Sequence, residues 1–502
     1  MNIRFSKALL ASVALSVSAL SASAQSTVTV VLPEEPPSLE PCESKHSSVG
    51  RVIIRNVTQP LTVLDPDSGE LRPLLATSWE QLDELTWRFT LKEGVTFSDG
   101  SAFNAAAVGA ALERLQRTDI VCNTKEQTLG GVTLTATSVD DLTVDITTTE
   151  PVPILPTMMS VVQMSAPSMP MEGASRTPIG TGPFTLTGWK AGESISLARR
   201  DDYWGDTPEV EAATFVWRSE SAVRAAMVEK GEADIALVIA GVDADDPSMD
   251  FAYPNGETTR MRISTAVPPL DDVRVRRALN LALDLEAMKP IIGAEAQLAS
   301  QLVGPAVNGF DTELKPYGYD PEAARELVAE ARADGVPIDR TITIIGREGI
   351  YPGSTEILEA MQALWAEVGL TTEIRTFDTG NWLRYQNRPF PEPDMPNVHT
   401  DQHDNLLGDA TFTLFNKYHS NGVNSTLADA QVDALIEQGE PAVGQPRTDA
   451  FRKAFARIHD ELVADVFMYH MVGYTRVNPR VQWKPSVSTN SELDLSQIRM
   501  AN

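Results

Sequence analysis

The chain has 502 residues, 42% of them hydrophobic and 22% charged, which is the composition of a folded globular protein and excludes a fibrous or largely disordered chain. A domain usually holds about 100–200 residues, so this length predicts two or three domains. The net charge of −28 repels phosphate backbones and anionic lipid headgroups, which disfavours nucleic-acid binding and membrane-surface binding.

Residues 1–24 have the pattern of a secretory signal peptide. Arg4 and Lys7 precede an apolar run over residues 8–20, and the small residues Ala22 and Ala24 stand where a signal peptidase binds. A membrane anchor is the weaker alternative, because the run of about 13 residues is shorter than the roughly 20 that cross a bilayer. We predict cleavage before Gln25 and a soluble mature protein located in the periplasm.

The exported part contains two cysteines, Cys42 and Cys122. An even number of cysteines in an oxidising compartment predicts one disulfide bond between them. Two free buried thiols are the alternative. The spacing offers no Cys-x-x-Cys or Cys/His pattern of a zinc site.

In the first half of the chain, residues 87–91 alternate between apolar and polar side chains, as a half-buried strand requires. The alternation resumes at 95–97 after Gly94, which predicts a β-hairpin over 87–97. Apolar side chains at helical spacing predict a helix over 105–115.

In the second half, helices and strands alternate. Asp271 or Asp272 is placed to cap a helix over about 273–283, and Asp320 precedes a helix that ends near Gly335. A strand over 342–345, a helix from 354 to Gly369 and a strand beginning at 372 follow. This alternation between about 270 and 380 predicts α/β layers.

Five blocks of sequence occur in the order that is typical of one family. They are WE at 79–80 with LTWRFTLKEGVTFSDG at 85–100, PIGTGPF at 178–184, YWGD at 203–206, DVRVRRAL at 272–279 and GYDPEAA at 318–324. Together these blocks resemble the extracellular solute-binding proteins of family 5, which include dipeptide, oligopeptide and nickel-chelate receptors of ABC importers. The resemblance covers nearly the whole mature chain.

The resemblance implies an α/β fold, the two-lobed periplasmic-binding-protein fold of type II in its large, three-subdomain variant. Lobe I would comprise residues 25–260, with an extra subdomain over about 60–180, and would take back residues 474–502. Lobe II would comprise residues 261–473. The ligand would bind in the cleft between the lobes, where a hinge motion encloses it.

In peptide-binding relatives an aspartate of lobe II accepts the α-ammonium group of the ligand. The matching segment here is HTDQHDNLLGD at 399–409. If Leu406 and Leu407 are read as an insertion, Asp404 and Asn405 match the amine-binding position and Asp409 matches a later aspartate of the motif. A carboxylate in a closing cleft suits an ammonium group. The tryptophan that opens the family motif and the Pro-Asp that closes it are absent here, so the resemblance does not fix a peptide as the ligand.

His399 and His403 in the same segment have two interpretations. With Asp401 and Asp404 they could surround a metal or a metal chelate, but the spacing suits a metal only in a helix, and the flanking sequence is typical of a loop. The other interpretation is a hydrogen bond from one histidine to a ligand carboxylate. We predict no directly bound metal and no cofactor.

Lobe I should supply contacts just after its first strand. The segment ESKHSS at 43–48 offers Lys45, Ser47 and Ser48 to a ligand carboxylate or backbone, although a plain surface loop fits equally well. Tyr469, and less directly His470 and Tyr474, lie where the chain should return towards the hinge.

The resemblance therefore predicts a binding protein of an ABC importer that captures a short peptide or amino-acid conjugate and passes it to the transmembrane permease subunits. An opine, an oligosaccharide and a metal chelate are alternative ligands. We expect a monomer that binds no nucleic acid.

A periplasmic hydrolase and a periplasmic chaperone are the alternative classes. We find no Gly-x-Ser-x-Gly, His-Glu-x-x-His or Ser-x-x-Lys pattern with its companion motifs, so the sequence predicts no enzyme. A chaperone would share the fold and would bind unfolded chains with little side-chain preference.

Overall fold

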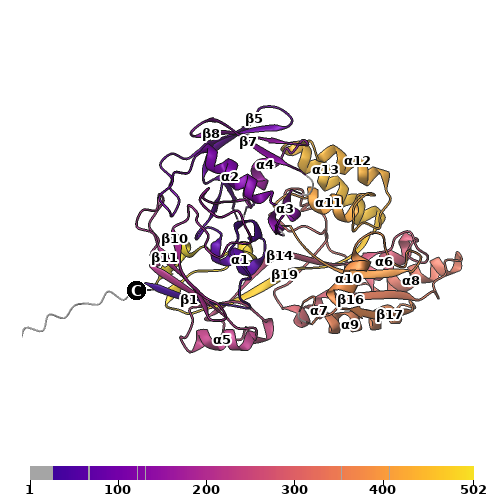
Figure 1. Cartoon of the computed structure of the whole chain (residues 1–502). Coiled ribbons are helices and arrows are strands. Elements are labelled where there is room, and N and C mark those ends of the chain that lie inside the picture. Colours follow the sequence, from indigo (N-terminus) through magenta and orange to yellow (C-terminus); the bar gives the residue numbers. More distant parts are fainter. Residues whose placement is uncertain are drawn as a thin grey trace, which may run out of the picture.

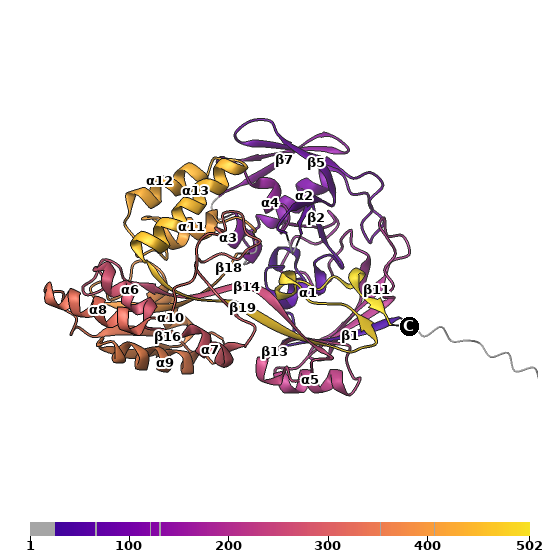
Figure 2. The same cartoon turned by 180° about the vertical axis from the view of Figure 1, so that it is seen from behind.

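The structure, a computed structural model, describes residues 26–501 apart from 66, 67, 121, 130, 131, 352 and 406. The predicted signal peptide, including the cleavage site before Gln25, lies outside these residues. Two lobes are visible, joined by a pair of long strands (Figures 1 and 2). Within the described ranges, no helix combines the length and the apolar character that a bilayer crossing requires.

One sheet of eleven strands runs through both lobes. Its order is β10-β11-β12-β1-β13-β19-β14-β18-β16-β17, and the short strand β15 (Gln297–Leu298) pairs with β19. The two longest strands, β14 (Asp250–Ile263) and β19 (Asp465–Val477), lie side by side in antiparallel register. They therefore connect the lobes through backbone hydrogen bonds.

Lobe I contains the strands on the β13 side of β19. They are β1 (Thr27–Leu32), β10 (Phe184–Lys190), β11 (Ser194–Arg199), β12 (Ala212–Trp217) and β13 (Ile235–Ile239). The parallel pairing of β1 with β12 and β13 buries Val28, Val30 and Leu32 in one core and Val31 in another. Such an apolar strand needs cover on both faces, and α1 (Ser47–Ile53) and α5 (Ser221–Glu229) lie on opposite sides of this sheet (Figures 1 and 2).

A peripheral subdomain is attached to lobe I. Its antiparallel sheet has the order β5-β6-β8-β7, formed by β5 (Ala76–Gln81), β6 (Thr86–Leu91), β7 (Leu134–Asp140) and β8 (Thr143–Thr148). Helix α2 (Ala105–Leu115) packs on this sheet and shares its core with the fully buried Phe89 and Phe97.

Lobe II has an α/β part and a helical part. Strands β16 (Ile342–Arg347), β17 (Thr372–Phe377) and β18 (Asn397–Asp404) are parallel and are packed by α6 (Val273–Leu281), α7 (Leu285–Ile292), α8 (Pro321–Ala333), α9 (Ser354–Glu367) and α10 (Thr379–Gln386). Helices α11 (Thr411–Tyr418), α12 (Ala430–Gly439) and α13 (Gln445–Ala456) surround a separate core.

Short elements complete the chain. Lobe I holds β2 (Gln59–Pro60), β3 (Thr62–Leu64), β4 (Leu71–Pro73), β9 (Gln163–Met164), β20 (Val481–Gln482), β21 (Arg499–Met500), α3 (Asn123–Thr128), α4 (Leu155–Met158), and the turns η1 (Pro41–Glu43), η2 (Gly241–Asp243), η4 (Val487–Asn490) and η5 (Leu495–Gln497). Lobe II holds the π-helical turn η3 (Arg457–Leu462).

The predicted helices and the α/β layers are confirmed. Helix α2 spans residues 105–115 as expected. The side chain of Asp272 accepts a hydrogen bond from the backbone nitrogen of Arg274 at the start of α6, and Asp320 accepts one from Ala323 at the start of α8. These caps satisfy amides that the first helical turn leaves without partners.

The predicted hairpin over 87–97 is wrong. Strand β6 ends at Leu91 and pairs with β5 and β8 instead. Residues 95–103 form their own turn, in which the backbone nitrogen of Phe97 donates to Ser101 and that of Phe103 donates to Val95. The alternation at 95–97 reflects burial of Val95 and Phe97 in the subdomain core, not strand pairing.

Two glycines shape the crossing strands. Strand β14 has two more residues than β19 between the pairs Pro254–Val472 and Thr258–His470, and Gly256 within this bulge adopts a φ of 79°. A Cβ on Gly473 would lie 2.4 Å from the ring of Tyr253, so any larger residue there would have to displace this buried ring. The predicted lobe boundaries, after 260 and after 473, fall inside these strands, and the point at which the lobes separate stays a prediction.

The two cysteines lie together in lobe I. Both are buried, and the sulfur of Cys122 donates a hydrogen bond of 3.2 Å to the carbonyl oxygen of Cys42. Both are free thiols in this structure, so the predicted disulfide is not formed here. A hydrogen bond between the two side chains, followed by burial, raises the pKa of Cys42, and the same bond lowers the pKa of Cys122.

A buried ion network ties the crossing strands to lobe II. Arg260 of β14, which is fully buried, binds Asp401 of β18 at 2.9 Å and Asp465 of β19 at 2.7 Å. Lys417 of α11 binds Asp401 from the other side at 3.0 Å, and Tyr418 donates to Asp465 at 2.6 Å. One guanidinium therefore joins three adjacent strands.

Replacing Arg260 should destabilise the protein strongly. In Arg260→Met, Asp401 and Asp465 lose a common partner inside the lobe, so the free energy of unfolding should fall by about 3–5 kcal/mol. Urea unfolding measures this change. The matched control is Arg274→Met on α6, where a half-exposed ion pair is worth about 0–1 kcal/mol. Equal losses in the two variants would contradict a central role for Arg260.

Candidate ligand-binding site

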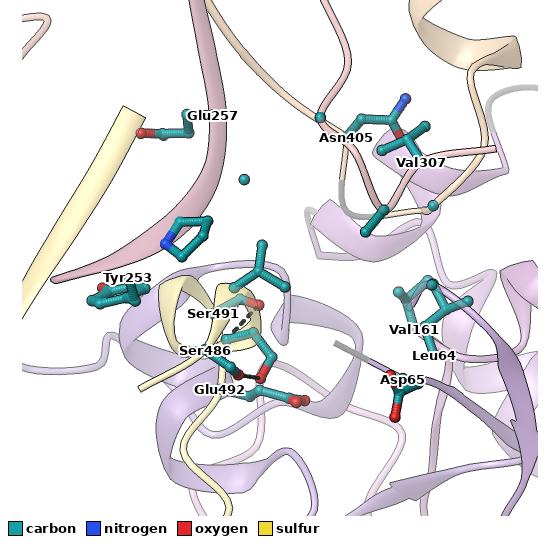
Figure 3. Close-up of a pocket in the computed structure, with 18 of the residues that line it drawn as sticks. Leu64, Asp65, Val161, Tyr253, Glu257, Val307, Asn405, Ser486, Ser491 and Glu492 are labelled. Carbon is teal, nitrogen blue, oxygen red and sulfur yellow. Dashed lines mark hydrogen bonds between the residues drawn. The ribbon is translucent and has the colours of Figure 1, made fainter. Parts of the chain in front are cut away.

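A cavity of about 400 Å³ lies between the two lobes and the strands that join them (Figure 3). Lobe I contributes residues around Ser44–Lys45, 63–65, 160–163 and 485–492; the crossing strands contribute 252–258 and 470–471; lobe II contributes 304–307, Asn405 and Gly408. Ligand pockets commonly have volumes of about 300–1,000 Å³ and lie at domain interfaces. This volume suits a small solute.

Much of the cavity wall is apolar. Side chains from both lobes form it, including Val63, Leu64 and Val161 of lobe I and Val307 of lobe II. Figure 3 shows Leu64 and Val161 near each other, across from Ser486 and Ser491. An apolar wall with a few polar groups is the usual lining of a site that binds a small organic ligand.

Glu257 is the acidic residue at the crossing. It follows the bulge of β14, is half-buried, and accepts hydrogen bonds from Gln402 at 2.5 Å and from Asn255 at 3.0 Å. Burial, and then the nearby carboxylate of Asp404, raise the pKa of Glu257 to about 7, while the two hydrogen bonds oppose the shift. Asp404 is its register partner on β18.

Lys45 is the basic residue of the cavity. It lies in lobe I between η1 and α1 and is half-buried, and across the described ranges it forms no ion pair. Burial lowers the pKa of Lys45, and the carboxylate of Asp404 in lobe II partly offsets this effect. The two lobes therefore place opposite charges near each other without joining them.

His470 lies beside these charges and is held neutral. Its Nδ1 is 2.9 Å from the hydroxyl of Thr258, and burial lowers its pKa to about 4. Tyr253 on β14 completes this part of the lining, and burial raises its pKa. Both rings offer polar atoms at the cavity without adding charge at neutral pH.

The predicted site residues divide into two groups. Lys45 and Asn405 line the cavity, as does His470, whereas Asp404 is exposed and lies next to the lining as the partner of Glu257. Ser47 and Ser48 are the first residues of α1 and are not part of the lining; the hydroxyl of Ser48 contacts Nδ1 of His46 at 2.9 Å.

The second group has structural contacts inside lobe II. Arg447 binds Asp409 through both carboxylate oxygens at 2.8 Å, and the hydroxyl of Tyr469 donates to the carbonyl of Leu285 at 2.8 Å. His403 is buried, with Nε2 2.7 Å from the hydroxyl of Thr413.

His399 also lies away from the cavity. It is fully buried, and neither of its ring nitrogens has a hydrogen-bond partner among the described residues. Its ring packs against Trp382 with 5.0 Å between centroids, and burial holds its pKa well below the usual value. This environment favours a neutral core histidine.

The segment of the two histidines is a strand, whereas the described flanking residues 393–396, 405, 407 and 408 are loop, as predicted. Strand β18 covers residues 397–404, so successive side chains alternate between its faces. His399, Asp401 and His403 share one face, and no group of three metal-ligating side chains is found in the part of the chain that the structure describes.

Most of the lining was missed by the sequence analysis, including the acidic residues Glu257 and Glu492. Glu257 belongs to a polar stretch, 255–258, inside an otherwise strand-like segment, and this was the available signal. Glu492 lies near the C-terminus, and no local pattern indicates that this segment returns to the cavity.

The shared sheet, the two crossing strands and the cavity between the lobes define a two-lobed binding protein. Comparison with known proteins agrees. A sequence model described as bacterial extracellular solute-binding proteins, family 5 middle, matches residues 70–395. The glutathione-binding protein GsiB of Pectobacterium atrosepticum is 30% identical over 359 residues, which are 68% of this chain and 68% of that protein. The chain belongs to the bacterial extracellular solute-binding proteins of family 5, and the predicted resemblance is confirmed.

Solved structures share the fold. The ABC transporter substrate-binding protein CtaP of Listeria monocytogenes superposes with a TM-score of 0.81 at 21% identity, covering 95% of this chain and 99% of CtaP. DppA of Helicobacter pylori, in complex with the peptide STSA, gives 0.71 at 19% identity, covering 94% of this chain and 98% of DppA. The predicted two-lobed α/β fold is therefore confirmed.

The raised pKa of Glu257 should make stability fall with pH. An unfolded glutamate has a pKa of 4.5 and the folded one about 7, so the folded protein holds the proton more tightly across this interval. Stability is therefore lost as pH rises from about 4.5 through about 7, by about 1–3 kcal/mol. Glu257→Gln should remove this loss.

Urea unfolding of the ligand-free protein at pH 5 to 8 measures the effect. The variant should match the wild type near pH 5 and exceed it at pH 8. Glu330→Gln, at an exposed position of α8, is the control and should keep the wild-type slope. Parallel pH profiles for wild type and Glu257→Gln would show that Glu257 does not titrate in this interval.

Proposed function

We propose that the protein captures a small zwitterionic, peptide-like solute between its lobes and delivers it to the transmembrane permease of an ABC importer. The observation that carries this proposal is the cavity between the lobes, which holds Lys45 from one lobe and Glu257, beside Asp404, on the other side without pairing them. A ligand with both a carboxylate and an ammonium group would satisfy both charges.

Each charge has a proposed role. Lys45 would bind the ligand carboxylate, and Asp404 with Glu257 would bind the ammonium group. Charge-assisted hydrogen bonds of this kind are short and strong, and they replace hydration that is lost when the cleft closes. Asn405 and His470 would complete the polar contacts. Ser47 and Ser48, together with the buried residues His399, His403, Asp409 and Tyr469, would support the site indirectly.

The crossing strand offers backbone contacts as well. Residues 250–254 of β14 pair with β19 on one side, and β18 pairs with β14 only from Glu257 onward. On the side of residues 250–256 that faces away from β19, no described strand pairs with the backbone of β14. An extended peptide could add to such an edge through main-chain hydrogen bonds, which bind many sequences alike.

Lobe closure would supply the signal to the permease. Lobe I would comprise residues 25–260, with a subdomain over about 60–180 and the return at 474–502, and lobe II would comprise 261–473. The bulge at Gly256 and the return near Gly473 would be the hinge. The ligand would shift the population towards the closed form only through its tighter binding to that form.

Export and oligomeric state belong to the same proposal. The signal peptide over 1–24 would direct the chain to the periplasm and be removed, and the mature protein would act as a monomer without a cofactor, with no catalytic activity and no nucleic-acid partner.

Native mass spectrometry of protein purified without denaturation tests the ligand class. A copurified mass that matches a short peptide or amino-acid conjugate is expected. A sugar, an opine or a metal chelate would overturn the peptide assignment and keep the binding function. Hydrolysis of added peptides by the pure protein would instead support an enzyme.

Substitutions at the charged residues should weaken binding. Asp404→Asn and Lys45→Met each remove the partner of a ligand charge that closure of the cleft would desolvate, so each should cost about 2–5 kcal/mol of binding free energy. Calorimetry measures this with the copurified ligand, or with the tripeptide Ala-Leu-Ala where none copurifies. Asp394→Asn, at an exposed position, is the control. Unchanged affinity in both variants would remove these residues from the site.

The exported protein should contain a disulfide between Cys42 and Cys122. The two residues already touch, and an oxidising compartment favours the bond. Intact mass should be lower by two hydrogen atoms, and reduction should lower the free energy of unfolding by about 2–4 kcal/mol. Cys42→Ala is the control, because its stability should not respond to reductant. Alkylation of both thiols in protein taken from the periplasm would contradict the bond.

A further inference from the structure

The cavity contains an excess of acidic groups that have no ion pair. Lys45 is the one lysine or arginine among the described residues of the lining, whereas Asp65, Glu257 and Glu492 are acidic. Asp65 is compensated by Arg72 at 2.7 Å. Glu257 and Glu492 form no ion pair with any residue that the structure describes, and neither does Asp404 beside them.

Glu492 lies in a part of the cavity separate from Glu257. It follows η4 on the C-terminal segment of lobe I, and its backbone nitrogen donates to Ser488 at 2.8 Å. Figure 3 shows Glu492 beside Ser486 and Ser491, well apart from Glu257 on β14. A zwitterion held by Lys45 and Glu257 would therefore leave the carboxylate of Glu492, which has a side-chain hydrogen bond with Ser488, without a cationic partner.

The surroundings of Glu492 do not neutralise it. Arg55, the cation that acts on the pKa of Glu492, is itself bound to Asp494 at 3.1 Å. Burial is the main cause that raises the pKa of Glu492; Asp494 reinforces the shift and Arg55 opposes it. A half-buried carboxylate without a cation is costly unless something else supplies one.

We infer that Glu492 forms a second acidic subsite and that the cavity selects peptide-like ligands with a cationic side chain over anionic ones. This inference rests on the proposed function and names its substrate class. Glutathione carries two carboxylates and one ammonium group, so it would bring excess negative charge to a cavity that is already acidic. The net charge of −28 adds a long-range field of the same sign. The charge preference therefore differs from the one that the names of the GsiB relatives suggest.

A matched panel of tripeptides tests the charge preference by calorimetry. It consists of Ala-Leu-Ala, the three alanine tripeptides with lysine at one position, the same three with glutamate, and glutathione. At least one lysine peptide should bind about tenfold or more tighter than Ala-Leu-Ala, and the glutamate peptides and glutathione about tenfold or more weaker. Glutathione or a glutamate peptide binding as tightly as the best lysine peptide would overturn the inference.

The role of Glu492 has its own variant. Glu492→Gln should lose the preference for the best lysine peptide, about tenfold or more, while Ala-Leu-Ala binds as in the wild type. Glu84→Gln, exposed on the β5–β6 turn, changes the net charge equally and should keep the preference. An unchanged preference in a folded Glu492→Gln would overturn this assignment.

The outcomes distinguish a failure of the charge preference from a failure of the proposed ligand class. If the variant does not fold, as judged by its thermal transition, the panel on the wild-type protein still decides the charge preference. Binding of all tripeptides without regard to charge would refute only the acidic subsite. Binding of none of them would refute the peptide-like ligand itself, and with it this inference.

Discussion

The hydrogen-bonded pair of β14 and β19 is the constraint on which the rest of the structure depends. These strands carry the sheet from lobe I into lobe II, so neither lobe can move without bending or twisting this pair. Arg260 links both strands to β18 through Asp401 and Asp465, which fixes the pair firmly on the lobe II side. On the other side of the bulge at Gly256, Arg476 of β19 binds Asp250 of β14 at 2.6 Å and so fixes the lobe I end of the pair. The bulge lies between these two ion networks and next to the cavity, which is why we propose it as the hinge.

The placement of the cavity follows from this connection. Strands β14 and β19 form its floor, and each lobe supplies one wall. A lobe rotation about the floor changes the separation of the walls more than it changes the floor itself. Residues on the floor, such as Glu257 and His470, therefore keep their mutual geometry, whereas Lys45 approaches or leaves them with lobe I. Such an arrangement lets a ligand that bridges floor and wall favour one lobe orientation.

Much of the fold could be predicted from sequence because its signals are local. Asp272 and Asp320 mark the starts of their helices by capping, which depends on neighbouring residues alone. The pairing of residues 87–97 could not be predicted in this way. An alternation of apolar and polar side chains shows which side chains are buried, but not which strand supplies the backbone hydrogen bonds. Strand β6 pairs with β8, more than fifty residues away. The lobes themselves were predicted through ordered family blocks, not through periodicity.

The site could be predicted only in part, for a related reason. His399 and Asp404 were grouped as ligand candidates because they share one segment, although strand β18 places them in different environments, His399 in the core and Asp404 exposed next to the cavity. Lys45 and Asn405 were found because they match family positions. Glu492 comes from the last segment of the chain and reaches the cavity that Lys45 also lines only through tertiary folding, which no local pattern records.

The titratable carboxylate of Glu257 lies at the bulge of β14, where we propose that the lobes hinge. Glu257 directly follows Gly256 in the bulge, and it is also where the pairing of β14 with β18 begins. Ionisation of a half-buried carboxylate demands a counter-charge or water, and both depend on how far the lobes are open. A cationic group that binds here would stabilise the ionised form and a closed cleft together. In the proposed function, the same few residues of β14 would therefore serve both as the hinge and as part of the binding site.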